Sequence, residues 1–491
     1  MHTKRYSARH ILSATLLAAC CCLLFSAVAL AGVKEWESLY KQGKIDEAIT
    51  VVTAAVSQKP ADPVARRWLG FLLLQKQDYA GALTQLTEAR ALKANSDEMR
   101  LNLGMAYIGL NQGDKAIVEL EQALVMHKDW AEAYYNLGTA YYATHQLDKA
   151  IAAYQKAELL AAPNAALQNN LGLALAEKGR KTQAVTALKK AVELDPKSAQ
   201  YAYNLGFVQR QAGNQAGATG AFEKCLALDS KRVDAHLALA ELLSASGNDA
   251  EALSHYVSAS ILKPDDFSAQ YNSGVIYSKL GMFDKAAAAF QAAVRINPDD
   301  AETLSGLGWA LFKSGSTTEG IAALEQAVKK KPSLLSAWLN LGTAYMIQGK
   351  NAEAVEAWST ALKLDPKQLA AAINLGNLYH QSKDYAKAVT AYQAAVQINP
   401  KSSDACYGMG LAYSNLGKTD EAIAQYNKAI QINPKMAAAY NNLGVELEKK
   451  NQVDQAKAQY RKALEIDPNN ADAKRNLDRF TVKPTPPGAP G

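Results

Sequence analysis

Residues 131–164, AEAYYNLGTAYYATHQLDKAIAAYQKAELLAAPN, decide the fold of this 491-residue chain. Apolar side chains recur three and four residues apart over about 131–144 and again over about 147–160, which predicts two amphipathic helices joined by a short turn. The pattern returns every 34 residues, and its Leu-Gly glycine marks each unit at Gly70, Gly104, Gly138, Gly172, Gly206, Ala240, Gly274, Gly308, Gly342, Gly376, Gly410 and Gly444. So strict a period predicts a stack of helical hairpins in which each repeat packs only on its neighbours.

Small and large side chains alternate along the second helix of each repeat. The slots of Ala150 and Ala157 hold Ala in nearly every repeat, and the slot of Tyr154 between them holds a large apolar residue. Large beside small is how closely packed helices interdigitate. The turn after the first helix needs a positive φ, which Gly or Asn supplies. The residues in that slot are Gly43, Asn111, Gly179, Gly213, Gly247, Gly281, Gly315, Gly349, Gly417 and Asn451.

This 34-residue unit resembles the tetratricopeptide repeat. The residues that carry the resemblance in one unit are Tyr134, Leu137, Gly138, Tyr141, Ala150, Tyr154 and Ala157, and the match covers roughly residues 33–480. The resemblance implies an all-α fold, a right-handed α-solenoid of about 12–13 helix-turn-helix repeats. It also implies a concave groove that the first helices line.

Five segments follow from the pattern. We expect a signal peptide at 1–31, a partial repeat at 32–62, twelve repeats at 63–470, a capping helix at 471–480 and a disordered proline-rich tail at 481–491. Crowded glycines in the middle of the array also predict a softer joint near 213–225, because interior helical Gly costs roughly 1 kcal/mol relative to Ala.

The N-terminal segment has the pattern of a secretory signal. Basic residues in 1–10 precede an uncharged stretch over 11–30, and small residues surround Ala31, after which we expect cleavage. Two alternatives stay open: the apolar stretch remains as a membrane anchor, or processing at Cys20 yields a lipoprotein. In each case the repeats lie outside the cytoplasm, in the periplasm or cell envelope. Membrane association follows only if the segment is retained or lipidated.

Charge and chemistry exclude several classes of function. Removal of Lys4, Arg5 and Arg9 with the signal leaves 50 basic and 47 acidic residues, a balance that argues against a nucleic-acid partner. The histidines are scattered, and the signal is followed by only two cysteines, Cys225 and Cys406. We therefore predict no catalytic residue, no metal site and no cofactor.

The slot before Leu-Gly holds Asn in eight of twelve repeats: Asn102, Asn136, Asn170, Asn204, Asn272, Asn340, Asn374 and Asn442. Helical spacing places this slot beside the packing face, toward the groove. An amide carries both a donor and an acceptor, so a ladder of amides could bind an extended peptide by its backbone. The slot resembles the asparagine ladder that lines the superhelix of the protein O-GlcNAc transferases. Local packing is the alternative interpretation, and both stay open here.

Aromatic residues on the same face are further candidates for peptide binding, and those we single out are Tyr135, Tyr142, Tyr203 and Trp309. The resulting hypothesis is a non-enzymatic scaffold that binds a peptide or protein segment in its groove, within a bacterial envelope assembly. Two alternatives are a regulatory or targeting subunit of a separate enzyme, such as a glycosyltransferase, and a carbohydrate-binding solenoid.

Overall fold

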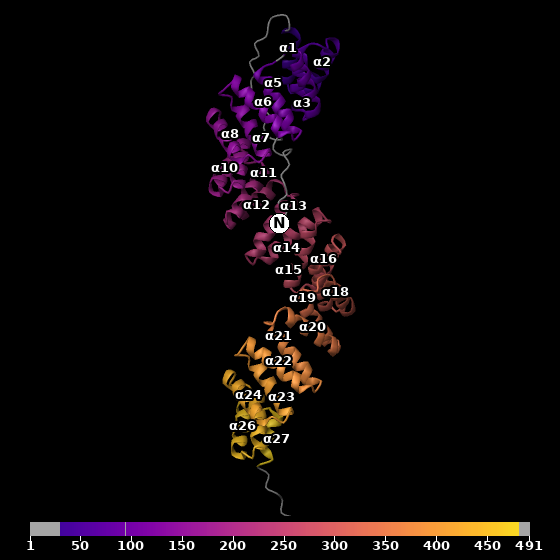
Figure 1. Cartoon of the computed structure of the whole chain (residues 1–491), viewed down its shortest axis with the longest axis vertical. Coiled ribbons are helices and arrows are strands. Elements are labelled where there is room, and N and C mark those ends of the chain that lie inside the picture. The colour runs from indigo at the N-terminus through magenta and orange to yellow at the C-terminus, as the bar shows by residue number, and fades with distance from the viewer. Residues whose placement is uncertain (1–29, 94, 481–491) are drawn as a thin grey trace, which may run out of the picture. The chain divides into compact units, whose positions relative to one another are not determined.

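The computed structural model describes residues 30–93 and 95–480 (Figure 1). The predicted signal, up to residue 29, and the proline-rich tail at 481–491 lie outside the described residues. Within the described ranges the chain forms α-helices and no strand. It divides into two compact units, the first ending at Leu262 and the second beginning at Lys263. Each unit is a stack of helical hairpins.

The first unit contains the helices α1 to α14. They are α1 (Leu30–Lys41), α2 (Ile45–Gln58), α3 (Pro63–Gln75), α4 (Tyr79–Ala91), α5 (Asp97–Gly109), α6 (Gly113–Met126), α7 (Ala131–Ala143), α8 (Leu147–Leu160), α9 (Ala165–Glu177), α10 (Lys181–Leu194), α11 (Ala199–Gln211), α12 (Gln215–Leu228), α13 (Val233–Ala245) and α14 (Asp249–Leu262).

The second unit contains α15 to α27. They are α15 (Phe267–Lys279), α16 (Phe283–Ile296), α17 (Ala301–Lys313), α18 (Thr317–Lys330), α19 (Leu335–Ile347), α20 (Asn351–Leu364), α21 (Leu369–Gln381), α22 (Tyr385–Ile398), α23 (Ser403–Asn415), α24 (Thr419–Ile432), α25 (Ala437–Lys449), α26 (Val453–Ile466) and α27 (Ala471–Asp478).

The expected hairpin at 131–164 is confirmed. Helix α7 ends at Ala143 and α8 begins at Leu147, and both lie within a residue of the bounds that the apolar spacing predicts. Odd-numbered helices are the first helices of the repeats and even-numbered ones the second, and the two helices of a repeat pack against each other. The all-α repeat solenoid that the period predicts is the fold of the protein.

The large side chain of the second helix explains why the Leu-Gly position holds glycine. A Cβ at Gly138 would lie 2.7 Å from the ring of Tyr154, which is fully buried. The same approach recurs in both units, for example between Gly376 and Tyr392. The absent side chain therefore lets the two helices of a repeat interdigitate around one large residue.

The turn after the first helix has positive φ in every one of the glycine and asparagine positions predicted. Gln77, His145 and Lys383 occupy the same slot and also have positive φ, at 62°, 57° and 62°. The hairpin geometry therefore imposes the left-handed conformation even on residues that disfavour it.

The first described helix packs on the rest of the array. Helix α1 begins at Leu30, has 12 residues and precedes α2 in the predicted partial repeat. Its Val33 and Trp36 are buried with Val52 of α2. The boundary between the two units follows Leu262, one repeat beyond the softer joint predicted at 213–225, whose local stability stays a prediction.

Candidate peptide-binding face

The first helices form the inner face of each unit. Within the first unit α3, α5, α7, α9 and α11 contact one another in succession. Within the second unit α15, α17 and α19 do so, as do α21, α23, α25 and α27. Second helices of neighbouring repeats approach less closely. Each unit therefore curves with its first helices on the concave side, the face on which the sequence places the asparagine ladder.

The ladder divides between the units. Asn102, Asn136, Asn170 and Asn204 belong to the first unit and are buried. Asn272, Asn340, Asn374 and Asn442 belong to the second unit and are half-buried. Accessible amides on the concave face are therefore found among the second set.

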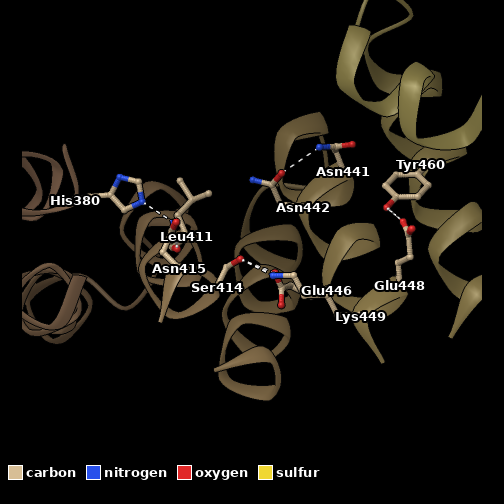
Figure 2. A network of polar contacts seen from close by, with 10 residues as sticks. All are labelled: His380, Leu411, Ser414, Asn415, Asn441, Asn442, Glu446, Glu448, Lys449 and Tyr460. Atoms are coloured by element: carbon tan, nitrogen blue, oxygen red, sulfur yellow. Dashed lines mark hydrogen bonds and ion pairs between the residues drawn. The ribbon is translucent and has the colours of Figure 1, made fainter. Parts of the chain in front are cut away.

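An amide relay connects successive repeats at the end of the second unit. Asn442 Nδ2 donates to the hydroxyl of Tyr407 in the preceding repeat at 3.0 Å. Asn441 Nδ2 donates to Asn442 Oδ1 at 3.1 Å, as Figure 2 shows. Asn476 of α27 then donates to Asn441 Oδ1 at 3.0 Å. Three consecutive first helices are thus linked by one chain of side-chain hydrogen bonds.

The same relay exists in the first unit. Asn170 Nδ2 donates to the Tyr135 hydroxyl at 3.0 Å, Asn169 Nδ2 to Asn170 Oδ1 at 3.1 Å, and Asn204 Nδ2 to Asn169 Oδ1 at 2.7 Å. The structure thus brings together the predicted residues Tyr135 and Asn170. Asn136 instead donates to its own helix, at the Glu132 carbonyl, 2.9 Å away.

The relay depends on residues that the ladder prediction missed. Asn169 and Asn441 stand directly before a ladder Asn, so each forms an Asn-Asn doublet with a Tyr in the equivalent position one repeat earlier. This Asn-Asn doublet, with a Tyr one repeat earlier, is the sequence pattern that could have predicted the relay. Bonds of this kind join residues 35 apart, which shows that the ladder has a packing role between repeats.

Packing does not use the full capacity of the amides. An asparagine side chain offers two N–H donors and an oxygen with two lone pairs. Asn442 uses one donor toward Tyr407 and one lone pair toward Asn441. The relay therefore holds the plane of the amide while one donor and one lone pair remain.

The aromatic candidates lie in two settings. In the first unit Tyr135 and Tyr142 are half-buried, whereas Tyr203 is buried, with the Arg232 guanidinium 4.1 Å from its ring centroid. In the second unit the half-buried Trp309 stacks on Phe312, with 5.6 Å between the ring centroids. Part of the Trp309 ring therefore stays accessible.

A second polar network crosses three repeats of the second unit (Figure 2). Asn415 Nδ2 lies 3.2 Å from His380 Nε2. Ser414 Oγ donates to Glu446 Oε1 at 2.5 Å, and Lys449 Nζ donates to the same oxygen at 2.6 Å. Glu446 is 1% exposed, and its other oxygen has no hydrogen-bond partner. Burial and the hydrogen bonds to the Glu446 carboxylate explain this network as a packing contact between repeats.

Between residues 30 and 480, residue 94 excepted, no helix is long and apolar enough to cross a membrane. The same residues contain no group of three or more His, Cys, Asp or Glu side chains placed to hold a metal ion.

The array of helical hairpins defines a repeat protein, and comparison with family models identifies the repeat family. Models described as the tetratricopeptide repeat, or TPR repeat, match residues 35–98, 73–141, 131–163, 172–213, 237–301, 271–334, 305–358, 339–403, 403–436 and 437–470. The chain therefore belongs to the tetratricopeptide repeat family. Proteins of this family are generally non-catalytic scaffolds that bind protein or peptide partners.

Solved structures of similar chains are also found. YrrB, described as a TPR protein with an unusual peptide-binding site, is 24% identical over 40% of this chain and 100% of that chain, with a TM-score of 0.37. MamA is 31% identical over 34% of this chain and 96% of that chain, with a TM-score of 0.32. The C-terminal part of a TPR repeat-containing protein from Cytophaga hutchinsonii is 19% identical over 48% of this chain and 98% of that chain, with a TM-score of 0.44. None of the curated proteins matches the chain.

Proposed function

We propose that this protein is an exported, non-enzymatic scaffold that binds an extended segment of a partner protein along the concave face of its first helices. The observation that carries the proposal is the amide relay. Hydrogen bonds from Asn441 and to Tyr407 orient Asn442, and they leave one donor and one lone pair on a half-buried side chain. This donor and this lone pair can form hydrogen bonds with the C=O and the N–H of a peptide backbone.

Preorganisation is the physical reason to assign binding as well as packing. A free asparagine loses rotamer freedom when it binds a ligand, at a cost of about 0.5–1.5 kcal/mol per side chain. An amide that its neighbours already hold has lost that freedom on folding. Among the half-buried ladder residues of the second unit, Asn442 is held in this way and is therefore the one we expect to contribute most. Asn272, Asn340 and Asn374 add further half-buried amides along the same ladder.

Aromatic and cationic groups near the ladder support a protein ligand. Trp309 stacks on Phe312, and the Lys313 ammonium lies 5.7 Å from the Trp309 ring centroid. Apolar surface beside polar donors is typical of sites that bind peptide side chains while hydrogen bonds hold the backbone.

The binding test compares alanine variants on the two faces of the second unit. Peptides are selected from a displayed random library against the full chain, and their affinities are measured for Asn340→Ala/Asn374→Ala/Asn442→Ala. We expect a loss of about tenfold or more, because one lost hydrogen bond is worth about 1 kcal/mol. The control is Asn351→Ala/Asn427→Ala, which removes exposed amides from second helices and should leave affinity unchanged.

Recognition of the peptide backbone predicts a second result with the same peptides. N-methylation of the peptide at the bound amides should weaken binding to wild type and should have little effect on the residual binding of the triple variant. Full affinity in the triple variant, with its helical content intact, would show that the ladder serves only to pack the repeats.

The export proposal rests on the pattern of residues 1–31 and the envelope role on the family resemblance. Expression in a bacterial host followed by fractionation should place the chain in the periplasm, with Gly32 as its first residue by mass spectrometry. A Cys20→Ala substitution should leave this product unchanged. An unprocessed chain in the cytoplasm would contradict the proposal.

A further inference from the structure

A cavity of about 240 Å³ lies in the second unit among α18, α19 and α20. Its lining includes the aromatic residues Trp338 and Tyr345 and the acidic residues Glu325, Glu353 and Glu356. Small-molecule sites are usually about 300–1,000 Å³. This cavity therefore suits a single side chain better than a separate ligand.

The cavity is distinct from the concave face. Two of its three helices, α18 and α20, are second helices of their repeats. The ladder residue of α19, Asn340, is not among its lining residues. A group bound here would not compete directly with a segment bound along the ladder.

The acidic groups of the cavity lack ion-pair partners in the part of the chain that the structure describes. Glu325, Glu353 and Glu356 are exposed, and none forms an ion pair with a basic side chain in the described parts of the protein. The basic residues at the end of α18 pair elsewhere, Lys330 with Asp299 and Lys331 with Glu302. Three carboxylates around one space leave a local excess of negative charge.

Tyr345 lies at the centre of this field. Its hydroxyl donates to Glu325 Oε1 at 2.6 Å. Burial, that hydrogen bond and the nearby charges of Glu325, Glu353 and Glu356 all raise the pKa of Tyr345. All three carboxylates therefore act on the Tyr345 hydroxyl. The Lys350 ammonium lies 5.7 Å from the Tyr345 ring centroid, so this ring already attracts a cation of the chain itself.

Trp338 supplies a second, fixed aromatic surface. Its indole Nε1 donates to the Pro332 carbonyl at 2.9 Å, which holds the orientation of the ring. The side chain is half-buried, so part of it remains accessible. An aromatic surface attracts a cation through its quadrupole, and the effect is greatest for Trp.

We propose that this cavity binds an arginine side chain of a partner protein. A planar guanidinium can stack on the Trp338 ring while its N–H groups reach the carboxylates of Glu353 and Glu356. A lysine ammonium lacks both the plane and the forked donors, so it fits the same walls less well. The inference stands on the cavity alone and does not depend on peptide binding along the ladder.

The test follows the indole N–H signal of Trp338 by nuclear magnetic resonance in the full chain. Trp338→Phe assigns the signal among those of the six tryptophans. The probe is the capped peptide acetyl-Gly-Arg-Gly-amide, with Lys and Glu analogues for comparison. We expect a saturable shift with a Kd on the order of 1 mM, as suits one side chain in water.

Two charge variants decide the outcome. Glu353→Gln/Glu356→Gln should weaken binding of the Arg peptide by about twofold to thirtyfold, the range expected for the loss of two exposed ion pairs. Glu421→Gln/Glu465→Gln, on distant second helices, should leave binding unchanged. Equal binding by the Lys peptide, an unchanged Kd in the first variant, or no shift at all would each overturn the proposal.

Discussion

Gly342, the marker glycine of the repeat that contains α19 and α20, should not tolerate a side chain. A Cβ at this position would lie 2.4 Å from Nε1 and 2.5 Å from Cδ1 of Trp358. Both distances are far shorter than van der Waals contact, so the indole would have to move. Trp358 is 1% exposed and packs on Ala354 and Leu378, so it has little free volume around it. We expect an overpacking cost of about 1–3 kcal/mol.

Gly220 is the matched control. It also lies inside a helix, α12, but a Cβ there would meet nothing within 4 Å. Replacing an interior helical Gly by Ala gains about 1 kcal/mol of helix propensity at either site. Because this gain is common to both variants, their difference isolates the overpacking. Gly220→Ala should therefore stabilise its surroundings relative to Gly342→Ala by about 1–3 kcal/mol.

Hydrogen exchange followed by mass spectrometry measures the effect locally. Stability in a repeat array is a sum of local terms, so one global unfolding temperature would blur the comparison. We expect faster exchange over 335–364 in Gly342→Ala and slower exchange over 215–228 in Gly220→Ala. Slower exchange over 335–364 would refute the reasoning, because the indole would then have accommodated the new methyl group without cost.

Three further predictions follow from strained or buried groups. Lys383→Gly should stabilise the hairpin of α21 and α22 by about 1 kcal/mol, since Lys383 has φ of 62°, and unchanged exchange over 369–398 would contradict this. Glu446→Leu should also stabilise α25, because it removes a buried carboxylate oxygen that has no partner. The same slot is apolar in the other repeats. A lower midpoint of unfolding in urea would contradict this prediction. Acid should weaken the pairing of α13 and α14: burial and His236 lower the pKa of His255 below its usual 6.5, although Glu251 opposes the shift. The stability that neutral His255 contributes is fully present above about pH 6.5 and is lost as pH falls through the lowered pKa. His255→Gln should therefore remove the pH dependence of hydrogen exchange over 233–262.

The turn slot illustrates what a sequence can predict. A period of 34 residues repeats the contacts inside each hairpin, so twelve copies of one pattern reveal which positions are small, large or left-handed. Positive φ at Gly179 or Asn451 follows from residue type alone. Positive φ at His145 and Lys383 follows only from their place in the repeat, since neither residue favours that conformation.

The ladder shows where sequence reasoning stops. Asn170 and Asn442 were recognisable as recurrent amides, but their bonds to Tyr135 and Tyr407 join residues 35 apart in different repeats. Such a bond depends on how one repeat is rotated on the next, which no single repeat specifies. The unpaired oxygen of Glu446 is a second example, because only the packing of α23 against α25 decides whether it finds a partner.

By itself the sequence determined the hairpin, the period and the family, because these depend on interactions within a repeat and between like neighbours. Only the tertiary structure decided which amides are accessible and which are held in a relay. It also decided that three acidic residues of two helices line one cavity with Trp338 and Tyr345. The physical reason is that hydrophobic periodicity records which face of a helix is buried, whereas hydrogen bonds and charge clusters arise where side chains of separate helices meet.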